Sequence, residues 1–244
     1  MDFALTEEQD AIFGMARDFG AVKIAPFAHQ WEKDGTIPRE VFQELAALGF
    51  GAIYVSEEDG GTGLTRLDAT LIFEALSMAC PSVAAFLSIH NMCAWMVASQ
   101  GSDELKAKWL EKLVSMEAIA SYCLTEPGSG SDAAALKTKA ARDGDGFVLN
   151  GAKAFISGGG YSDLYLVMCR TGEEGAAGIS AILVPDGTQG LSFGAKEDKM
   201  GWRAQPTTIV QFDDCRVDAG NLLGEEGAGF KYAMAGLDGG RRSE

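Results

Sequence analysis

The hydrophobic pattern of this chain changes near Met116, and this change constrains the fold more than any other feature. Before it, apolar residues recur at the three- and four-residue spacing of helices. After it, short runs of β-branched and aromatic residues alternate with turn-forming residues to about Val217. Helical spacing returns from Gly227 to Leu237. We therefore predict an α+β multidomain protein with an all-α N-terminal helical domain (1–117), an antiparallel β-barrel (118–226) and the start of a C-terminal helical domain (227–244).

Capping and breaking residues mark the helices expected in the first half. Thr6 and Gln9 fit a capping box at the start of the first helix, and Pro26 is expected to end that helix. A later helix that starts at Pro81 is apolar almost all round, so it should be central and buried. The helices expected after the first are 38–49, 67–78, 81–97 and 102–114.

Turn-forming pairs separate the strands expected in the second half. Asn150-Gly151 and Asp186-Gly187 are typical of hairpin turns, and they predict antiparallel neighbours in a barrel or a sandwich. The expected strands are 118–125, 136–142, 146–150, 152–156, 164–169, 179–184, 191–195 and 206–213.

Composition excludes several classes of protein. A hydrophobic content of 47% in 244 residues predicts a filled core and not disorder. The net charge of −15 would repel a polyanion, so nucleic-acid binding is not expected. The chain has no run of 18 apolar residues and starts with a polar, acidic segment. We therefore expect a soluble protein in a bacterial-type cytoplasm, with no signal peptide and no integral membrane segment.

Cysteine and histidine usage argues against a metal centre. The five cysteines are widely spaced and include no Cys-x-x-Cys pair, so we interpret them as reduced core residues. The two histidines, His29 and His90, are too few for a His-based zinc site, so each is interpreted as structural and no metal is expected.

Residues 122–132, with the sequence Tyr-Cys-Leu-Thr-Glu-Pro-Gly-Ser-Gly-Ser-Asp, are the strongest candidate for a binding loop. Their glycines allow the main chain to approach a ligand closely, and the hydroxyls of Thr125, Ser129 and Ser131 can donate or accept hydrogen bonds. The same residues are also typical of a tight surface turn between strands. Glu126 could act as a general base, although an exposed loop carboxylate is the simpler interpretation.

Other motifs are incompletely formed. Gly128-x-Gly130-x-x-Ala133 matches a dinucleotide fingerprint, but strands and hairpin turns follow it where a βαβ unit needs a helix. The glycine-rich segment 58–63 lacks the Lys-Ser/Thr pair of a phosphate-binding loop, and no Gly-x-Ser-x-Gly elbow is present. We therefore expect neither a Rossmann domain, nor a P-loop, nor a nucleophilic triad.

Four segments together resemble the acyl-CoA dehydrogenase family, and they occur in the family's order. Residues 122–132 look like its flavin and acyl-CoA signature, and residues 150–159 look like its second flavin segment. Residues 199–207 and 224–230 are similar to further landmarks. The resemblance extends over essentially the whole chain up to Arg241.

One branch of the family is matched best. Residues 88–95, 153–157 and 237–241 most resemble the branch that oxidises isobutyryl-CoA, a short, α-branched thioester of valine breakdown. The resemblance therefore implies an oxidoreductase of branched-chain amino-acid catabolism that acts on CH–CH groups.

The resemblance also implies a site for FAD and acyl-CoA. Phe155 stands where the family more often has tryptophan, and Ser157 stands where it has threonine, so a ring and a hydroxyl are kept. The residues implied to bind FAD are Tyr122, Cys123, Leu124, Thr125, Gly130, Ser131, Phe155, Ile156 and Ser157. Those implied to bind acyl-CoA are Ser131, Asp238, Gly239, Gly240 and Arg241.

The reaction implied is an α,β-dehydrogenation. A carboxylate removes the α-proton of the thioester, a hydride leaves the β-carbon for the flavin, and electrons pass to an electron-transferring flavoprotein. In most relatives that carboxylate lies in a C-terminal helical bundle, and in some it directly precedes the arginine, where this chain has Gly240. No catalytic base is therefore assigned.

The resemblance implies that the full-length relative is a homotetramer. We expect the 244 residues alone to be inactive and poorly soluble, because a missing bundle would leave apolar surface exposed. Two alternatives stay open: a non-catalytic module that binds flavin or a CoA ester, and a flavin oxidase or monooxygenase of the same fold. Flavin that acyl-CoA does not bleach would indicate the first, and rapid reoxidation by oxygen would indicate the second.

Overall fold

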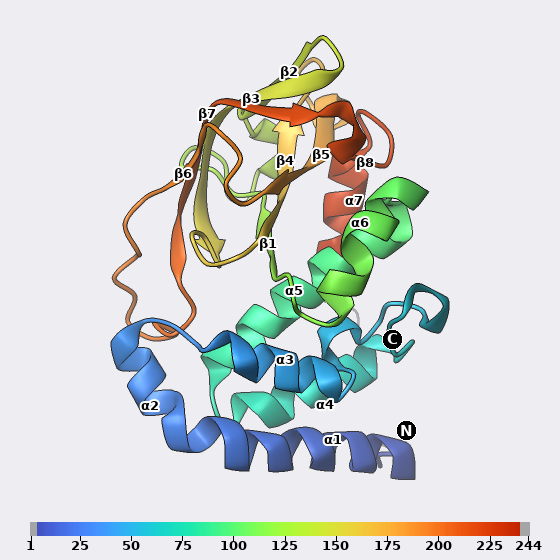
Figure 1. Ribbon diagram of the computed structural model, residues 1–244, viewed down its shortest axis with the longest axis vertical. Coiled ribbons are helices and arrows are strands. Elements are labelled where there is room, and N and C mark those ends of the chain that lie inside the picture. Colours follow the sequence, from blue (N-terminus) through green and yellow to red (C-terminus); the bar gives the residue numbers. More distant parts are fainter. Residues whose placement is uncertain (1–3, 240–244) are drawn as a thin grey trace.

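Helices form the first half of the chain and strands form most of the second half in this computed structural model, which describes residues 4–239 (Figure 1). The helices are α1 (Glu7–Phe19), α2 (Ala25–Asp34), α3 (Arg39–Ala47), α4 (Arg66–Ser77), α5 (Pro81–Gln100), α6 (Asp103–Val114) and α7 (Gly229–Gly239). The strands are β1 (Ala120–Cys123), β2 (Lys139–Asp143), β3 (Gly146–Ser157), β4 (Leu164–Arg170), β5 (Ile179–Pro185), β6 (Leu191–Phe193), β7 (Thr207–Asp218) and β8 (Leu222–Leu223).

The first helix starts as its capping residues predict but does not stop where Pro26 predicts. The Thr6 hydroxyl accepts from the Gln9 backbone N–H, and the Gln9 side chain accepts from Thr6 in return, which completes the capping box. The prediction that Pro26 ends the helix is wrong. A π-helical segment (Gly20–Ile24) connects α1 to α2, and Pro26 lies in the first turn of α2, a position that proline commonly occupies.

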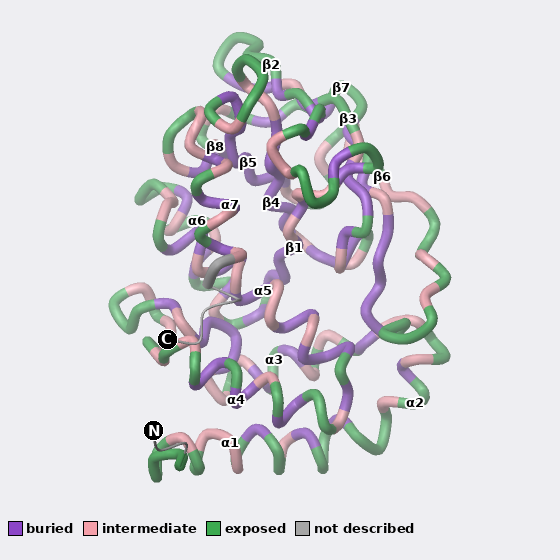
Figure 2. The backbone as a smooth tube through the Cα atoms, turned by 180° about the vertical axis from the view of Figure 1, so that it is seen from behind, coloured by how far each residue is buried: buried purple, intermediate pink, exposed green. Residues whose placement is uncertain are grey.

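Helix α5 lies between the other helices and the sheet, and most of its residues are buried (Figure 2). Within the described residues it is the one helix with the length and apolarity of a membrane span, yet 67% of that apolar window is buried inside the protein. The prediction that this helix is central and buried is confirmed. Its apolar character is explained by contact with both the helical body and β1.

The antiparallel barrel predicted from the hairpin signals is wrong in two respects. The eight strands form one mixed sheet in the order β6-β7-β3-β2-β4-β5-β8, and β1 pairs with β4 in parallel. Among residues 4–239 no pairing joins the edge strands β6 and β8, so hydrogen bonds do not close the sheet. Parallel pairing needs a long crossover, and the β2–β3 hairpin between β1 and β4 supplies it.

The Asn150-Gly151 pair is not a hairpin turn. Strand β3 runs unbroken from Gly146 to Ser157 and pairs with β7, with register shifts at Leu149/Gly151 and at Lys153/Ile156. Gly151 sits against Thr138, so a side chain at this position would collide with that backbone. The signal that predicted a turn therefore marks a bulge, which bends a long strand without reversing it.

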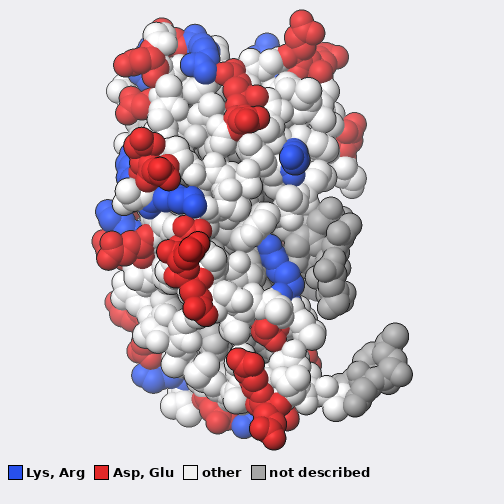
Figure 3. All heavy atoms as spheres, turned by 90° about the vertical axis from the view of Figure 1, so that its right-hand side faces the viewer, with Lys and Arg blue, Asp and Glu red and all other residues white. Residues whose placement is uncertain are grey.

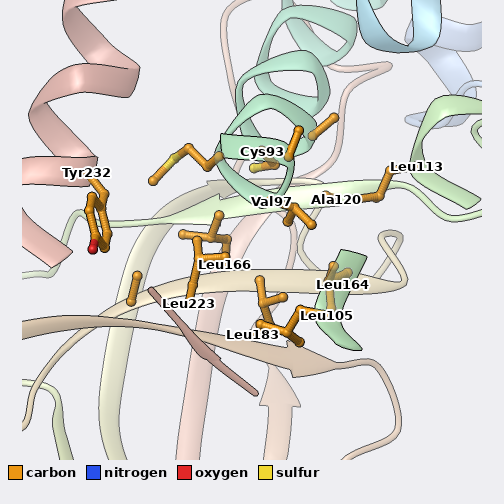
Figure 4. Close-up of a cluster of buried hydrophobic side chains, with 14 of the residues drawn as sticks. Cys93, Val97, Leu105, Leu113, Ala120, Leu164, Leu166, Leu183, Leu223 and Tyr232 are labelled. Atoms are coloured by element: carbon orange, nitrogen blue, oxygen red, sulfur yellow. The ribbon is translucent and has the colours of Figure 1, made fainter. Parts of the chain in front are cut away.

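The two faces of the sheet have separate cores, as the two-residue period of a strand requires. Leu164 and Leu166 of β4 pack toward the helices, with Val97 of α5 and Leu105 of α6 (Figure 4). Met168 of β4 belongs to the same cluster. The alternate residues of β4 pack with side chains inside the curled sheet. All five cysteines are buried and free, which confirms their interpretation as reduced core residues.

Acidic residues are widely distributed on the surface of the molecule. On the face shown in Figure 3, Asp and Glu side chains are spread from end to end, while Lys and Arg side chains appear singly or in small groups. No continuous basic patch is visible on this face, which agrees with the net charge of −15.

His90 links three elements at the base of the sheet. Its ring is fully buried on α5, Nδ1 accepts from the Ala120 backbone N–H at 3.1 Å, and Nε2 donates to the Leu113 carbonyl at 2.9 Å. Burial lowers the pKa of His90 to about 4, from an ordinary value of 6.5. The neutral ring therefore joins α5, the end of α6 and β1, as the structural interpretation of this histidine predicts.

Acidification should destabilise the protein through His90. Because its folded pKa lies below its unfolded value, its stabilising contribution is complete above pH 6.5 and is lost as the pH falls toward 4. We expect a loss of about 2 kcal/mol in unfolding free energy from this group between roughly pH 7.5 and 5. Urea denaturation across this range measures it. His90→Gln should remove this component and His29→Gln should keep it; equal pH profiles for both variants would contradict the assignment.

Candidate active site

A cleft of about 540 Å³ lies where β1, β3 and α7 meet. The cleft gathers residues that are far apart in sequence: the end of β1 with the loop after it, the last residues of β3, and one face of α7. The residues that line it include eight of the nine that the sequence implies for FAD: Tyr122, Leu124, Thr125, Gly130, Ser131, Phe155, Ile156 and Ser157.

Cys123 is the residue of that set that does not line the cleft. Its side chain is fully buried in the core inside the curled sheet, because successive residues of a strand point to opposite faces. Burial raises the pKa of the Cys123 thiol to about 12, so the sulfur is protonated at neutral pH. Its contribution is to the packing beneath the cleft.

Backbone conformation places Phe155 and Ser157 at the rim. Phe155 has a φ of +58° at the second register shift of β3, and the residue is 66% exposed. Gly158 follows with a φ of +82° and turns the chain away at the end of the strand. The Ser157 carbonyl accepts from the Ser121 hydroxyl at 2.5 Å, which ties the end of β3 to β1. An aromatic ring and a hydroxyl thus reach the cleft from one wall.

The opposite wall has an unpaired polar group and an open main chain. The Tyr122 hydroxyl is buried with no hydrogen-bond partner in the described protein, and burial raises its pKa above the usual range. A Cβ added to Gly128 or Gly130 would meet no atom within 4 Å, so the loop backbone faces open space. A buried polar atom without a partner is uncommon in native proteins. These features fit a wall that a ligand covers.

Glu126 is neither an exposed carboxylate nor a free base. Its side chain is 7% exposed and accepts from Lys153 Nζ at 2.8 Å, from the Lys137 backbone N–H at 2.6 Å and from the Thr138 backbone N–H at 2.9 Å. Burial alone would raise its pKa, but these hydrogen bonds and the Lys153 charge outweigh burial and hold the pKa below the ordinary value. An ionised, fully engaged carboxylate is a poor proton acceptor. The expectation of an exposed loop side chain is therefore wrong.

Helix residues complete the cleft and were not predicted from sequence. Ile89 of α5, and Phe230, Met234 and Leu237 of α7, line it. Their signal was only the apolar spacing of two helices, which does not say which positions face a ligand. Ile89 and Leu237 also line an adjoining groove of about 940 Å³ between α4, α5 and α7.

The residues implied for acyl-CoA are only partly described. Ser131 lines the cleft, and Asp238 and Gly239 lie in the last turn of α7, directly after Leu237. Gly240 and Arg241 lie outside the described residues. Their roles toward a CoA ester stay predictions.

Comparison with known protein families tests the family resemblance of the sequence motifs. Residues 6–117 match the family model "Acyl-CoA dehydrogenase, N-terminal domain", and residues 121–215 match "Acyl-CoA dehydrogenase, middle domain". The chain belongs to the acyl-CoA dehydrogenase family. Residues 122–132 and 150–159, which carried the resemblance, lie in and around the cleft described above.

Two curated relatives are isobutyryl-CoA dehydrogenases named as mitochondrial. The chain is 59% identical to the one from Dictyostelium discoideum over 97% of its length, and 52% identical to the one from Bos taurus, also over 97%. It covers 57% of the length of each of these relatives. This acyl-CoA dehydrogenase chain therefore spans a little more than half of the proteins it resembles.

Two solved structures superpose on nearly the whole chain. Butyryl-CoA dehydrogenase from Megasphaera elsdenii matches with a TM-score of 0.92 at 40% identity, covering 99% of this chain and 64% of that one. A structure described as the FAD complex of PigA matches with a TM-score of 0.91 at 31% identity, covering 97% of this chain and 63% of that one. The mixed sheet found here is thus part of the acyl-CoA dehydrogenase fold.

Proposed function

We propose that the protein containing this chain is an FAD-dependent dehydrogenase of a short, branched acyl-CoA, which it converts to the 2-enoyl-CoA. The observation that carries the proposal is the meeting of eight sequence-predicted residues in one cleft. The 59% identity to an isobutyryl-CoA dehydrogenase supports the substrate class. We further propose that the electrons pass to an electron-transferring flavoprotein, as the family resemblance implies.

The residues present fit a flavin. The unpaired Tyr122 hydroxyl offers a hydrogen bond, the open main chain at Gly130 allows close approach, and Phe155 offers an aromatic face. A cleft of about 540 Å³ is within the usual range of ligand sites, roughly 300–1,000 Å³. Tyr122, Leu124 and Thr125 would hold the ring system from one wall, with Phe155 and Ser157 on the other.

FAD, when bound, supplies the acceptor for the hydride that leaves the β-carbon. The chain's own contribution is orientation and exclusion of water. Ile89, Met234 and Leu237 present apolar surface at the cleft, which keeps water away and strengthens the hydrogen bonds made there. The hydroxyls of Thr125 and Ser157 can position polar atoms without adding charge.

The α-proton of the thioester must be taken by a carboxylate other than Glu126. Glu126 already accepts three hydrogen bonds and lies behind the cleft wall. We propose that the base belongs to the part of the relatives beyond the matched region, because the chain covers only 57% of their length.

Substrate bleaching tests the proposed function. We expect the purified full-length protein that contains this chain to bind FAD, and anaerobic addition of isobutyryl-CoA to bleach the visible absorbance of the bound flavin. Ser157→Ala should weaken FAD binding by up to about tenfold, since one hydrogen bond is worth roughly 0.5–1.5 kcal/mol. Ser192→Ala, at an exposed position of β6, is the matched control and should bind FAD normally. Folded protein that is colourless after incubation with excess FAD and removal of the unbound FAD would refute the proposal.

We also propose a homotetramer, a cytoplasmic location and a division of the chain at about residues 117 and 226. The family resemblance supports the tetramer, and the change of hydrophobic pattern supports the division.

A further inference from the structure

A buried ion pair lies directly behind the cleft and joins its two walls. Lys153 belongs to β3, two residues before Phe155, and its side chain is 0% exposed. Its Nζ donates to the Glu126 carboxylate at 2.8 Å and to the Leu124 carbonyl at 3.0 Å. Leu124 and Glu126 precede and follow Thr125 on the other wall. A single ammonium group therefore donates hydrogen bonds to both chain neighbours of Thr125.

A main-chain bond runs alongside this pair. The Ala154 backbone N–H donates to the Thr125 carbonyl at 2.8 Å. Three neighbouring hydrogen bonds therefore fix the end of β3 against the residues that follow β1, at the point where both enter the cleft. These two segments are not paired in the sheet, because β1 pairs with β4 and this part of β3 pairs with β7.

The carboxylate extends the connection to the rest of the loop. Glu126 accepts from the backbone N–H groups of Lys137 and Thr138, and its own backbone is paired with Ser129. The loop is thus closed on itself between Glu126 and Ser129, and it is attached to β3 through Thr125 and to residues 137–138 through Glu126. Two buried charges are costly to desolvate, so an ion pair at this place is weak evidence for stability alone.

We propose that Glu126 and Lys153 are positioning residues for the ligand of this cleft. The pair sets the separation of the Leu124–Thr125 wall from the Phe155–Ser157 wall, and so prepares the slot that a planar ring system enters. The inference rests on the proposed function for the identity of the ring, which is the flavin of FAD. Neither residue lines the cleft, so the pair acts through Thr125, Phe155 and the loop.

The experiment must distinguish an effect of the ion pair on FAD binding from an effect on the stability of the protein. Lys153→Met leaves the Glu126 charge buried without its partner, whereas the double variant Glu126→Gln/Lys153→Met removes both charges and should regain stability relative to the single variant. FAD affinity is measured by quenching of flavin fluorescence, with all variants folded by circular dichroism. Lys23→Met breaks an exposed ion pair with Glu44 and is the control.

We expect the double variant to regain stability but not FAD affinity. Lys153→Met and the double variant should both bind FAD more than tenfold more weakly than the wild type, with an altered visible spectrum of the bound flavin. Lys23→Met should bind it normally. Recovery of wild-type FAD affinity in the double variant, together with its stability, would overturn the proposal and leave the pair a structural role only.

A second readout needs no flavin. Without FAD, hydrogen exchange at the Ala154 amide should be more than tenfold faster in the double variant than in the wild type, because the Lys153 bonds no longer hold the walls together. Unchanged exchange would overturn the inference even if FAD binds. A wild type that binds no FAD, with the expected change in exchange, would refute the proposed function and leave the coupling of the walls supported.

Discussion

Replacing Lys153 by methionine is expected to lower the free energy of unfolding by about 3–5 kcal/mol. The side chain is 0% exposed, and its removal leaves the Glu126 carboxylate buried without its countercharge. The Leu124 carbonyl would also lose its hydrogen bond from Nζ. Chemical denaturation monitored by circular dichroism at neutral pH measures the loss.

The matched control is the same substitution at an exposed ion pair. Lys23 and Glu44 are about half exposed, at 51% and 47%, so Lys23→Met should change the unfolding free energy by no more than about 1 kcal/mol. Equal effects of Lys23→Met and Lys153→Met would show that burial does not decide the outcome.

The difference in the free energy of unfolding between the wild type and Lys153→Met should also depend on pH. The folded pKa of Glu126 is lowered, so the stabilisation from its charge is present above the ordinary carboxyl value of 4.5 and is lost as the pH falls through the folded pKa. We expect the difference to shrink as the pH falls, first as the unpaired Glu126 of the variant takes up a proton and then as the pH passes the folded pKa of Glu126 in the wild type.

Replacing Gly158 by alanine is expected to destabilise the protein by about 2–5 kcal/mol. A non-glycine residue in the left-handed region costs roughly 1–2 kcal/mol, and overpacking adds about 1–3 kcal/mol. Gly158 has a φ of +82°, and a Cβ there would lie 2.8 Å from the Phe86 ring and closer still to the Ser121 and Ser162 hydroxyls. Denaturation measures the loss, and FAD titration should show weaker binding because Ser157 is displaced.

Gly187 provides the control for backbone strain. Its φ of +74° is similar, but an added Cβ would meet nothing within 4 Å. Gly187→Ala should therefore show the strain alone, about 1–2 kcal/mol, with FAD binding unchanged. If both alanine variants lost the same stability, steric contact behind the cleft would not be the cause.

Local signals in the sequence predicted the helical half well. The capping box of Thr6 and Gln9 forms, and α3, α4, α5 and α6 lie close to the predicted ranges. Helix termini depend on neighbouring backbone groups, so nearby residues contain most of the information. Pro26 was misread because proline is as compatible with the first turn of a helix as with the end of one.

These local signals did not predict how the strands pair in the sheet. Asn150-Gly151 is typical of a hairpin, and only the contact of Gly151 with Thr138 shows that it is a bulge. The parallel pairing of β1 with β4 depends on residues 44 positions apart, such as Ala120 and Leu164, which local patterns do not relate. The strands were therefore found while their arrangement as an antiparallel barrel was not.

The sequence by itself determined the family, the approximate ranges of α3, α4, α5 and α6, and eight residues that line the cleft, because motifs and spacing are local properties of the chain. Only the tertiary structure decided what Glu126 does. Its neighbours Pro127 and Gly128 suggest an exposed turn, yet Lys153, 27 positions away, meets it in the interior. Burial and charge pairing are properties of residues brought together by folding, so sequence spacing alone does not reveal them.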